Sequence, residues 1–209
     1  MAACLTGLAG FVDAMGLRTL GDLFVSFMSG DSTEFAARAA RGEWTGAGKA
    51  AALIGAFVLG AALGSLVGRR AGARRPTAVL RVAAALLGAA ALLHLFALDR
   101  PAAAVMALAM GVQNGVFEGE SGIFAPTYVT GILVKSGQQL AAVLFGGPSE
   151  TLLRHASLWL GLICGAVAGT WIWGPLGLHG LWIAAGAAVL LSGAAARLGP
   201  SKGLGPAKG

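Results

Sequence analysis

Two groups of polar residues and glycines occur in this chain with the same order and spacing, and their side chains could bind a small solute or ion. Each member of the second group follows its counterpart by 101 residues, and the groups are Asp13, Ser26, Ser29 and Gly30, then Asn114, Thr127, Thr130 and Gly131. Carboxylate, amide and hydroxyl groups exchange hydrogen bonds with polar solutes, and a carboxylate also binds protons and cations. Repeated polar positions within apolar sequence are typical of small membrane transporters, whose binding site lies where two repeats meet.

Asp13 is the first candidate for a functional residue. It lies within an apolar segment, and an ionisable side chain inside a membrane span costs roughly a few kcal/mol or more. Its counterpart Asn114, next to Gln113, forms similar hydrogen bonds but carries no charge. An asymmetric pair of this kind suits a site that binds one proton or one cation. The alternative is that Asp13 lies at the membrane interface and caps a short helix.

The two glycines predict interruptions in the elements that contain them. Gly30 and Gly131 let the backbone unwind or approach a partner closely, and the hydroxyl groups just before them can satisfy the freed backbone groups. The amide groups after each glycine would then lie at a helix N-terminus, which favours an anionic group. Asp31 argues against a bare anion site in the first copy. The alternative is that these residues only pack helices together.

Asp31 and Glu34 have the spacing of a capping box, which predicts a short helix that begins there and ends near Arg41. Glu34 and Arg38 lie four positions apart, so we expect them to form an ion pair on one face of this helix.

The composition excludes an ordinary soluble domain. The chain is 56% hydrophobic and 11% charged, with a mean hydropathy of +0.77, whereas about a quarter of the residues of soluble domains are charged. We interpret the formal charge of +6 as membrane topology rather than nucleic-acid binding, because the basic residues cluster in short loops and the tail. Cys4 and Cys164 lie in apolar sequence, so no disulfide is expected. Three scattered histidines and the lack of enzyme motifs predict no metal site, no cofactor and no enzymatic activity.

The apolar segments predict an all-α, polytopic membrane helical bundle. Six of them approach the roughly 20 residues that cross a bilayer, and they are residues 2–20, 50–68, 77–98, 101–117, 158–173 and 178–196. Residues 23–41 and 125–144 are expected to be interrupted elements, unwound first and then helical; one continuous helix with a glycine kink is the alternative. Gly174-Pro175 is expected to end the fifth segment. Glycines at four-residue spacing, at 60, 64 and 68 and at 161, 165 and 169, indicate close helix packing.

These elements predict one membrane domain of two repeats, residues 1–98 and 101–196, followed by a disordered tail of residues 197–209. If the interrupted elements are re-entrant, each repeat crosses the membrane three times and the repeats are inverted. If they cross, each repeat has four crossings and the repeats are parallel. We favour six crossings, because they place the basic loop 69–75 and the tail on one side, which the positive-inside rule makes cytoplasmic.

The sequence around both polar groups resembles the paired motifs of the YoaK family of small bacterial inner-membrane proteins. The matching stretches are Gly10-Phe-Val-Asp13-Ala14 with Phe24-Val-Ser-Phe-Met28-Ser29-Gly30, and Met110-Gly111-Val-Gln113-Asn114 with Tyr128-Val-Thr130-Gly131. Asp31 departs from the pattern, because that family usually has asparagine there. The resemblance covers nearly the whole chain. It implies about six spans, inverted three-helix repeats, a distant relation to half of a major-facilitator transporter, and a homodimer that completes the transport path.

Together these observations predict a secondary permease for a small solute, coupled to protons or cations, that acts as a homodimer in the bacterial inner membrane. The expected partners are the lipid bilayer, a second copy of the chain, and a small solute or ion that the sequence does not identify. The expected site residues are Asp13, Ser26, Ser29, Gly30, Asp31, Gln113, Asn114, Thr127, Thr130 and Gly131. A passive channel built from the same broken elements and a non-transporting membrane scaffold are the alternatives.

Overall fold

The structure is a computed structural model that describes residues 1–118 and 126–198. Within those residues the chain forms eight α-helices, three short 3₁₀ helices and no strand, so the predicted all-α class is confirmed. The predictions for residue 125 and for the tail beyond residue 198 lie outside the described residues.

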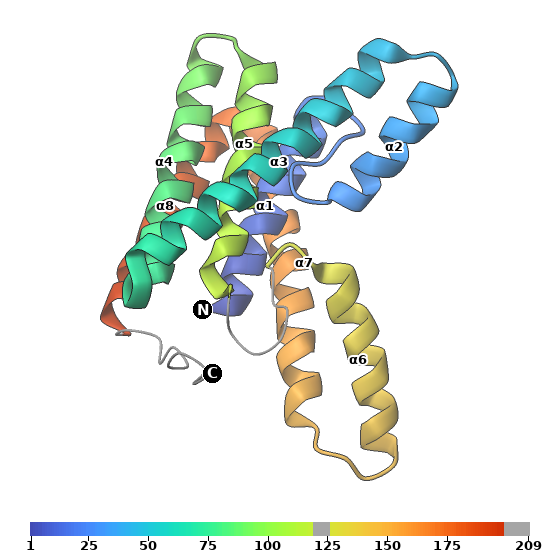
Figure 1. Ribbon diagram of the computed structural model, residues 1–209, viewed down its shortest axis with the longest axis vertical. Coiled ribbons are helices and arrows are strands. Elements are labelled where there is room, and N and C mark those ends of the chain that lie inside the picture. Colours follow the sequence, from blue (N-terminus) through green and yellow to red (C-terminus); the bar gives the residue numbers. More distant parts are fainter. Residues whose placement is uncertain (119–125, 199–209) are drawn as a thin grey trace, which may run out of the picture.

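The helices follow the predicted apolar segments closely (Figure 1). In chain order they are α1 (Ala2–Leu20), α2 (Met28–Ala40), α3 (Trp44–Ala71), η1 (Gly72–Arg74), α4 (Arg75–Leu95), α5 (Asp99–Gln113), η2 (Asn114–Phe117), α6 (Val129–Leu144), α7 (Glu150–Leu176), η3 (Gly177–Gly180) and α8 (Leu181–Arg197). The predicted end of the fifth segment at Gly174-Pro175 is wrong. Pro175 removes one backbone hydrogen bond from α7, but the backbone leaves the helical conformation only at Gly177, where φ is 54°.

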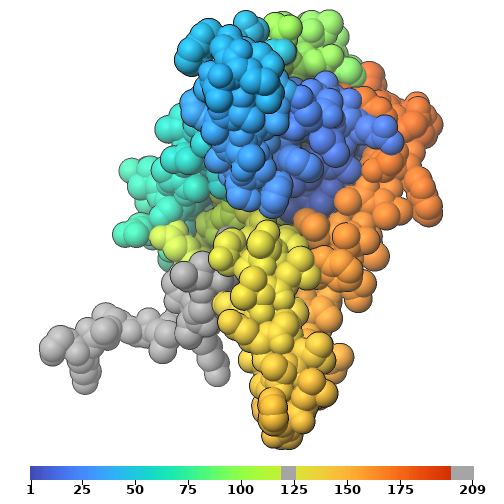
Figure 2. Space-filling view, turned by 90° about the vertical axis from the view of Figure 1, so that its right-hand side faces the viewer, coloured from blue at the N-terminus to red at the C-terminus, as the bar shows by residue number. Residues whose placement is uncertain are grey.

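α2 and α6 begin near the middle of the molecule and are short for membrane spans. They have 13 and 16 residues, about 20 and 24 Å of helix, and each packs along the helix that follows it, α2 on α3 and α6 on α7. Non-helical chain leads from α1 to α2, which confirms the predicted interruption within residues 23–41. α2 runs from the middle to one end of the molecule and α6 runs to the opposite end, so their first residues adjoin near the centre (Figures 1 and 2).

Glycines bring the backbones of two helix pairs into direct contact, as their four-residue spacing predicts. α1 packs along α7, and α3 packs along α5. A Cβ atom at Gly165 would collide with the carbonyl group of Gly7, and one at Gly60 would collide with the carbonyl group of Leu108. The next glycine contacts advance in the same direction along both helices, so the two helices of each pair run parallel. Such close approach is how helices associate in lipid, where water does not drive them together.

Two continuous helical stretches of the described chain are long and apolar enough to cross a membrane. They are Trp44–Leu95 and Glu150–Arg197, whose 18-residue apolar windows have mean hydropathies of 2.2 and 1.6. Each contains two α-helices joined by a 3₁₀ turn, α3 with α4 and α7 with α8. The turns begin at Gly72 and Gly177, both with a φ of 54°, which glycine adopts without strain. α4 packs on both α5 and α8 and so joins the two stretches.

Glu118 links the end of η2 to α3 and to the first residue of α4. Its Oε1 accepts a hydrogen bond from the Ser65 hydroxyl at 2.9 Å, and its Oε2 lies 3.0 Å from Nη1 of Arg75. Burial, which raises the pKa of Glu118, is outweighed by these two hydrogen bonds and by the charges of Arg75 and Arg69, so the pKa lies below its ordinary value.

Replacing Glu118 by glutamine is expected to lower the free energy of unfolding at neutral pH by about 1 kcal/mol or less, because the ion pair is partly exposed. A lowered folded-state pKa means that the carboxylate stabilises the fold above its unfolded pKa and that this stabilisation is lost as the pH falls through the folded pKa. Thermal unfolding in detergent should therefore separate variant from wild type at pH 7, and the two should converge in acid. Glu150→Gln, at an exposed start of α7, is the matched control. A difference that grows toward acid would contradict this account.

Candidate functional site

Asp13 holds the chain between α1 and α2 through three hydrogen bonds. Its Oδ1 accepts the backbone N–H groups of Val25 and Ser26 at 2.9 and 2.8 Å, and its Oδ2 accepts the Ser26 hydroxyl at 2.5 Å. Non-helical backbone in apolar surroundings needs such partners, because no water is there to pair with its N–H groups. A side chain on α1 therefore fixes where the chain turns back toward α2.

Asp31 holds the same segment from α2. Its Oδ1 accepts the backbone N–H of Phe24 at 2.9 Å, its side chain is fully buried, and its Oδ2 has no hydrogen-bond partner among the described residues. The predicted capping box is wrong, because α2 begins at Met28 without a side-chain cap and Asp31 lies inside its first turn, bonded to the preceding segment. The predicted pair of Glu34 and Arg38 is confirmed, with 2.6 Å between Oε1 and Nε.

Asn114 makes the corresponding contacts in the second half of the chain, with longer hydrogen bonds. Its Oδ1 accepts the Thr127 hydroxyl at 3.1 Å and the Thr127 N–H at 3.4 Å, and its Nδ2 donates to the carbonyl of Met110 at 3.1 Å. Asp13 and Asn114 thus each hold the residue thirteen positions further on. Only the first of the two side chains brings a charge to this arrangement.

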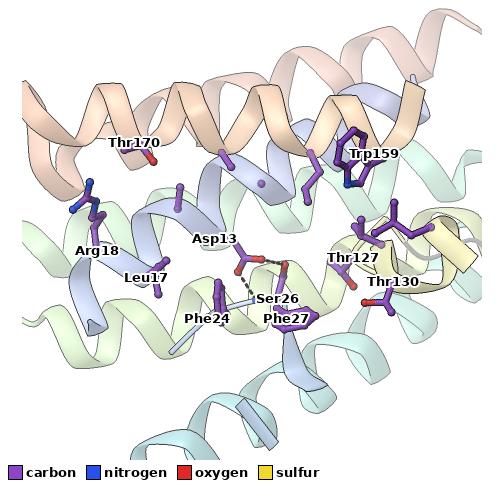
Figure 3. A pocket seen from close by; sticks show the side chains of 16 residues that line it. Asp13, Leu17, Arg18, Phe24, Ser26, Phe27, Thr127, Thr130, Trp159 and Thr170 are labelled. Atoms are coloured by element: carbon purple, nitrogen blue, oxygen red, sulfur yellow. Dashed lines mark hydrogen bonds between the residues drawn. The ribbon is translucent and has the colours of Figure 1, made fainter. Parts of the chain in front are cut away.

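The two segments held in this way meet at a cavity of about 370 Å³ between α1, α7 and the starts of α2 and α6 (Figure 3). Its polar side chains are Asp13, Arg18, Ser26, Thr127, Thr130 and Thr170. The larger apolar side chains around it are Leu17, Phe24, Phe27, Leu133, Trp159 and Leu162. A mostly apolar cavity with a few polar groups is typical of small-molecule sites, whose volumes are about 300–1,000 Å³.

A second cavity, of about 390 Å³, lies on the other side of the same junction, against α3 and the start of η2. The residues that line both cavities are Ser26, Phe27, Thr127, Val129 and Thr130. Ser29 and Asn114 line only the second cavity, as do Phe57 and Ala61 from α3. The starts of α2 and α6 therefore separate two hollows, one beside the carboxylate and one beside the amide.

Four of the predicted site residues line neither of these cavities. Gln113 is fully buried and donates through Nε2 to the carbonyl of Leu5 at 2.7 Å, which ties α5 to α1. Successive residues of a helix point about 100° apart, so Gln113 faces away from the junction that its neighbour Asn114 reaches. Gly30 and Gly131 lie under the rings of Phe27 and Tyr128, where a Cβ atom would collide with the ring. The fourth, Asp31, is the buried carboxylate described above.

The residues of the first cavity that the sequence interpretation missed include Arg18, Trp159 and Thr170. Arg18 lies five residues after Asp13 in the same apolar segment, and a basic residue there was the signal that could have found it. Trp159 and Thr170 are eleven residues apart, about three helical turns, and so share one face of α7. Nothing local in the sequence says that this face of α7 meets α1.

Comparison with known proteins shows to which family this chain belongs. Residues 1–194 match the family described as "Protein of unknown function (DUF1275)". The chain belongs to the DUF1275 family. A relative, the UPF0700 transmembrane protein RA0705 of Rhizobium meliloti (strain 1021), is 35% identical over 198 residues, which cover 93% of this chain and 84% of the relative. No solved structure matches the chain significantly.

Membership of DUF1275, the name of the transmembrane relative and the two apolar helical stretches together establish a membrane protein. The resemblance described from the sequence is confirmed in this coarser form, as a family of membrane proteins to which no activity is assigned.

Proposed function

We propose that this DUF1275 protein is a permease for a small solute, and that the solute binds where the two non-helical segments meet. The observation that carries the proposal is that residues 101 positions apart in the sequence, Ser26 and Thr127, line the same cavity, together with Asp13. Transporters place their sites at such junctions, where helices are broken and side chains replace the missing backbone hydrogen bonds.

The packing supports two inverted repeats. Gly7 packs on Gly165 and Leu108 packs on Gly60, so each half of the chain places its first helix on the third long element of the other half. Gly7 and Leu108 are 101 residues apart, the same offset as between the polar groups, and Gly60 and Gly165 are 105 residues apart. α2 and α6 run toward opposite ends of the molecule (Figure 1), as two re-entrant elements that enter the membrane from opposite faces would. Six crossings then remain: α1, α3, α4, α5, α7 and α8.

We place the turn between α3 and α4 on the cytoplasmic side of the inner membrane. This turn and the last residues of α8 line one hollow, through Arg74 and Ala195 among others, so both lie at the same end of the molecule. Residues 69–75 hold four arginines, and the positive-inside rule favours the cytoplasm for such a loop.

The two segments are held differently, one by a charged side chain and one by a neutral side chain. This difference suits a transporter whose cavity opens to the two sides of the membrane in turn. Asp13 holds its segment with three hydrogen bonds of 2.5–2.9 Å, and Asn114 holds the other with bonds of 3.1 and 3.4 Å. The segment held by Asn114 has the longer and weaker hydrogen bonds, so we expect the junction to open more easily at that segment. Asp13 is the group in this cavity through which a proton or cation gradient would act.

Flux measurements with purified full-length protein in proteoliposomes test the proposal. Vesicles loaded with a mixed extract of small metabolites should lose a subset of them, relative to protein-free vesicles, as measured by mass spectrometry. Thr130→Phe, which fills the cavity, should reduce that loss by about tenfold or more, because the ring occupies the space the solute needs. Leu190→Phe, on the exposed face of α8, is the matched control.

Two results would exclude the permease: vesicles with wild-type protein that lose nothing would favour a membrane scaffold, and loss that does not saturate with solute concentration would favour the passive channel. Equal loss through wild type and Thr130→Phe would reject the proposed site, because the path would then lie elsewhere.

A further inference from the structure

The first cavity contains one acidic and one basic side chain that do not pair with each other. Asp13 and Arg18 both line it, yet no ion pair joins them within 4 Å, and neither has a partner of opposite charge among the described residues. In Figure 3, Arg18 lies beside Thr170 at one end of the cavity, Asp13 lies in the middle, and Trp159 lies at the other end. Asp13 is the more enclosed of the two and Arg18 is exposed, so it is the carboxylate whose unpaired charge is costly unless a ligand or water compensates it.

Asp13 has room for one further hydrogen bond. Its Oδ1 accepts two backbone N–H groups and its Oδ2 accepts one hydroxyl, and a carboxylate has about four acceptor positions. All three existing donors are neutral groups, so they orient the carboxylate without neutralising its charge. The remaining position on Oδ2 suits a cationic donor such as an ammonium group.

Arg18 differs from the basic side chains near it. Arg38 binds Glu34 and Asp22, and it thereby occupies the carboxylate that lies four residues after Arg18. Arg41 binds Glu43 in the turn before α3. The guanidinium of Arg18 is left exposed at the cavity, and Thr170 of the neighbouring helix α7 lines the same end of it (Figure 3). A guanidinium and a hydroxyl on facing helices form a recognition site for a carboxylate.

We propose that this cavity binds a zwitterionic solute, namely an α-amino acid with an apolar side chain, a class that rests on the permease function proposed above. Arg18 and Thr170 bind its carboxylate, and Asp13 binds its ammonium group. The side chain of the solute lies against Trp159, Leu133 and Leu162, which line the rest of the cavity. An anion would leave Asp13 unpaired, and a cation would make no use of Arg18, whereas a solute with both charges pairs with both side chains that line the cavity.

Calorimetric titration of the full chain in detergent with three probes tests the proposal. The probes are L-phenylalanine, hydrocinnamate, which has the carboxylate only, and phenethylamine, which has the ammonium only. L-Phenylalanine should bind about tenfold or more tightly than either single-charge probe, because each charge-assisted hydrogen bond contributes about a tenfold gain or more.

Two variants show how much of this gain in affinity for L-phenylalanine each charge contributes. Arg18→Gln should weaken L-phenylalanine about tenfold and leave phenethylamine unchanged, and Asp13→Asn should weaken L-phenylalanine while leaving hydrocinnamate no weaker. Arg18→Lys, which retains the charge without the planar fork, should recover part of the loss. Arg100→Gln, at the exposed start of α5 and outside the cavity lining, is the control, and thermal unfolding checks that every variant is folded.

The zwitterion proposal is overturned if hydrocinnamate or phenethylamine binds wild type as tightly as L-phenylalanine, if none of the three probes binds, or if Arg18→Gln weakens all three equally. The proposed permease fails separately, when the protein binds L-phenylalanine with the expected pattern but vesicles show no flux of any solute. Saturable flux of other solutes without binding of the three probes would sustain the permease and reject the zwitterion.

Discussion

Leucine in place of Gly165 is expected to abolish the packing of α1 against α7 and with it most of the folded protein. The Cβ position at Gly165 is occupied by the carbonyl group of Gly7, and a backbone carbonyl cannot rotate away as a side chain can. The two helices would have to separate along their length. Overpacking in a tight core commonly costs about 1–3 kcal/mol and occasionally more, and we expect about 3 kcal/mol or more here because backbone meets backbone.

Purification in detergent measures this effect. The Gly165→Leu variant should yield little monodisperse protein by size-exclusion chromatography, and the remaining fraction should unfold at a much lower temperature than wild type. Gly186→Leu is the matched control, because that glycine lies on the exposed face of α8 with open space at its Cβ position. Gly60→Leu should behave like Gly165→Leu, since its Cβ position meets the Leu108 carbonyl in the equivalent way. Normal yield and unfolding temperature for Gly165→Leu would show that α1 and α7 are not held by this contact.

The helices and their glycine contacts could be predicted from the sequence because both depend on local patterns. An apolar run of about 20 residues is almost forced to be helical in lipid, so α1 was found with its structural bounds. Glycines four residues apart lie on one helix face, and a face of small residues in lipid predicts a close neighbour. Which helix is the neighbour is a long-range property. The row at Gly60 indicated contact but not that Leu108 makes it.

The candidate site could be predicted in part, for a similar reason. The shared offset of 101 residues marked Ser26 and Thr127 as equivalent in kind. It could not show that Arg18 and Trp159 complete the cavity, because these residues have no polar counterpart at that offset. Asp31 was misassigned as a cap, since its spacing to Glu34 fits that local motif and the competing partner, the N–H of Phe24, comes from a preceding non-helical segment. Motifs based on spacing within one helix fail where a buried side chain binds the backbone of another segment.

Replacing Asp13 by alanine is expected to release the segment between α1 and α2. The change leaves the N–H groups of Val25 and Ser26 and the Ser26 hydroxyl without their acceptors, and each buried group left unpaired costs about 1–3 kcal/mol. We expect a loss of about 3 kcal/mol or more in the free energy of unfolding, concentrated in this segment. Asp13→Asn should cost much less, because the Asn114 amide performs the same task for Thr127.

Hydrogen exchange measured by mass spectrometry separates this local effect from global unfolding. In Asp13→Ala the amides of Val25 and Ser26 should exchange at least about tenfold faster than in wild type, because they are no longer hydrogen-bonded, while the amides of α4 and α5 keep their protection. Asn114→Ala is the matched comparison: its bonds of 3.1 and 3.4 Å are longer, so the smaller change is expected there. If the amides of Val25 and Ser26 remain as protected in Asp13→Ala as in wild type, packing holds the segment, and the carboxylate of Asp13 is not needed to keep it in place.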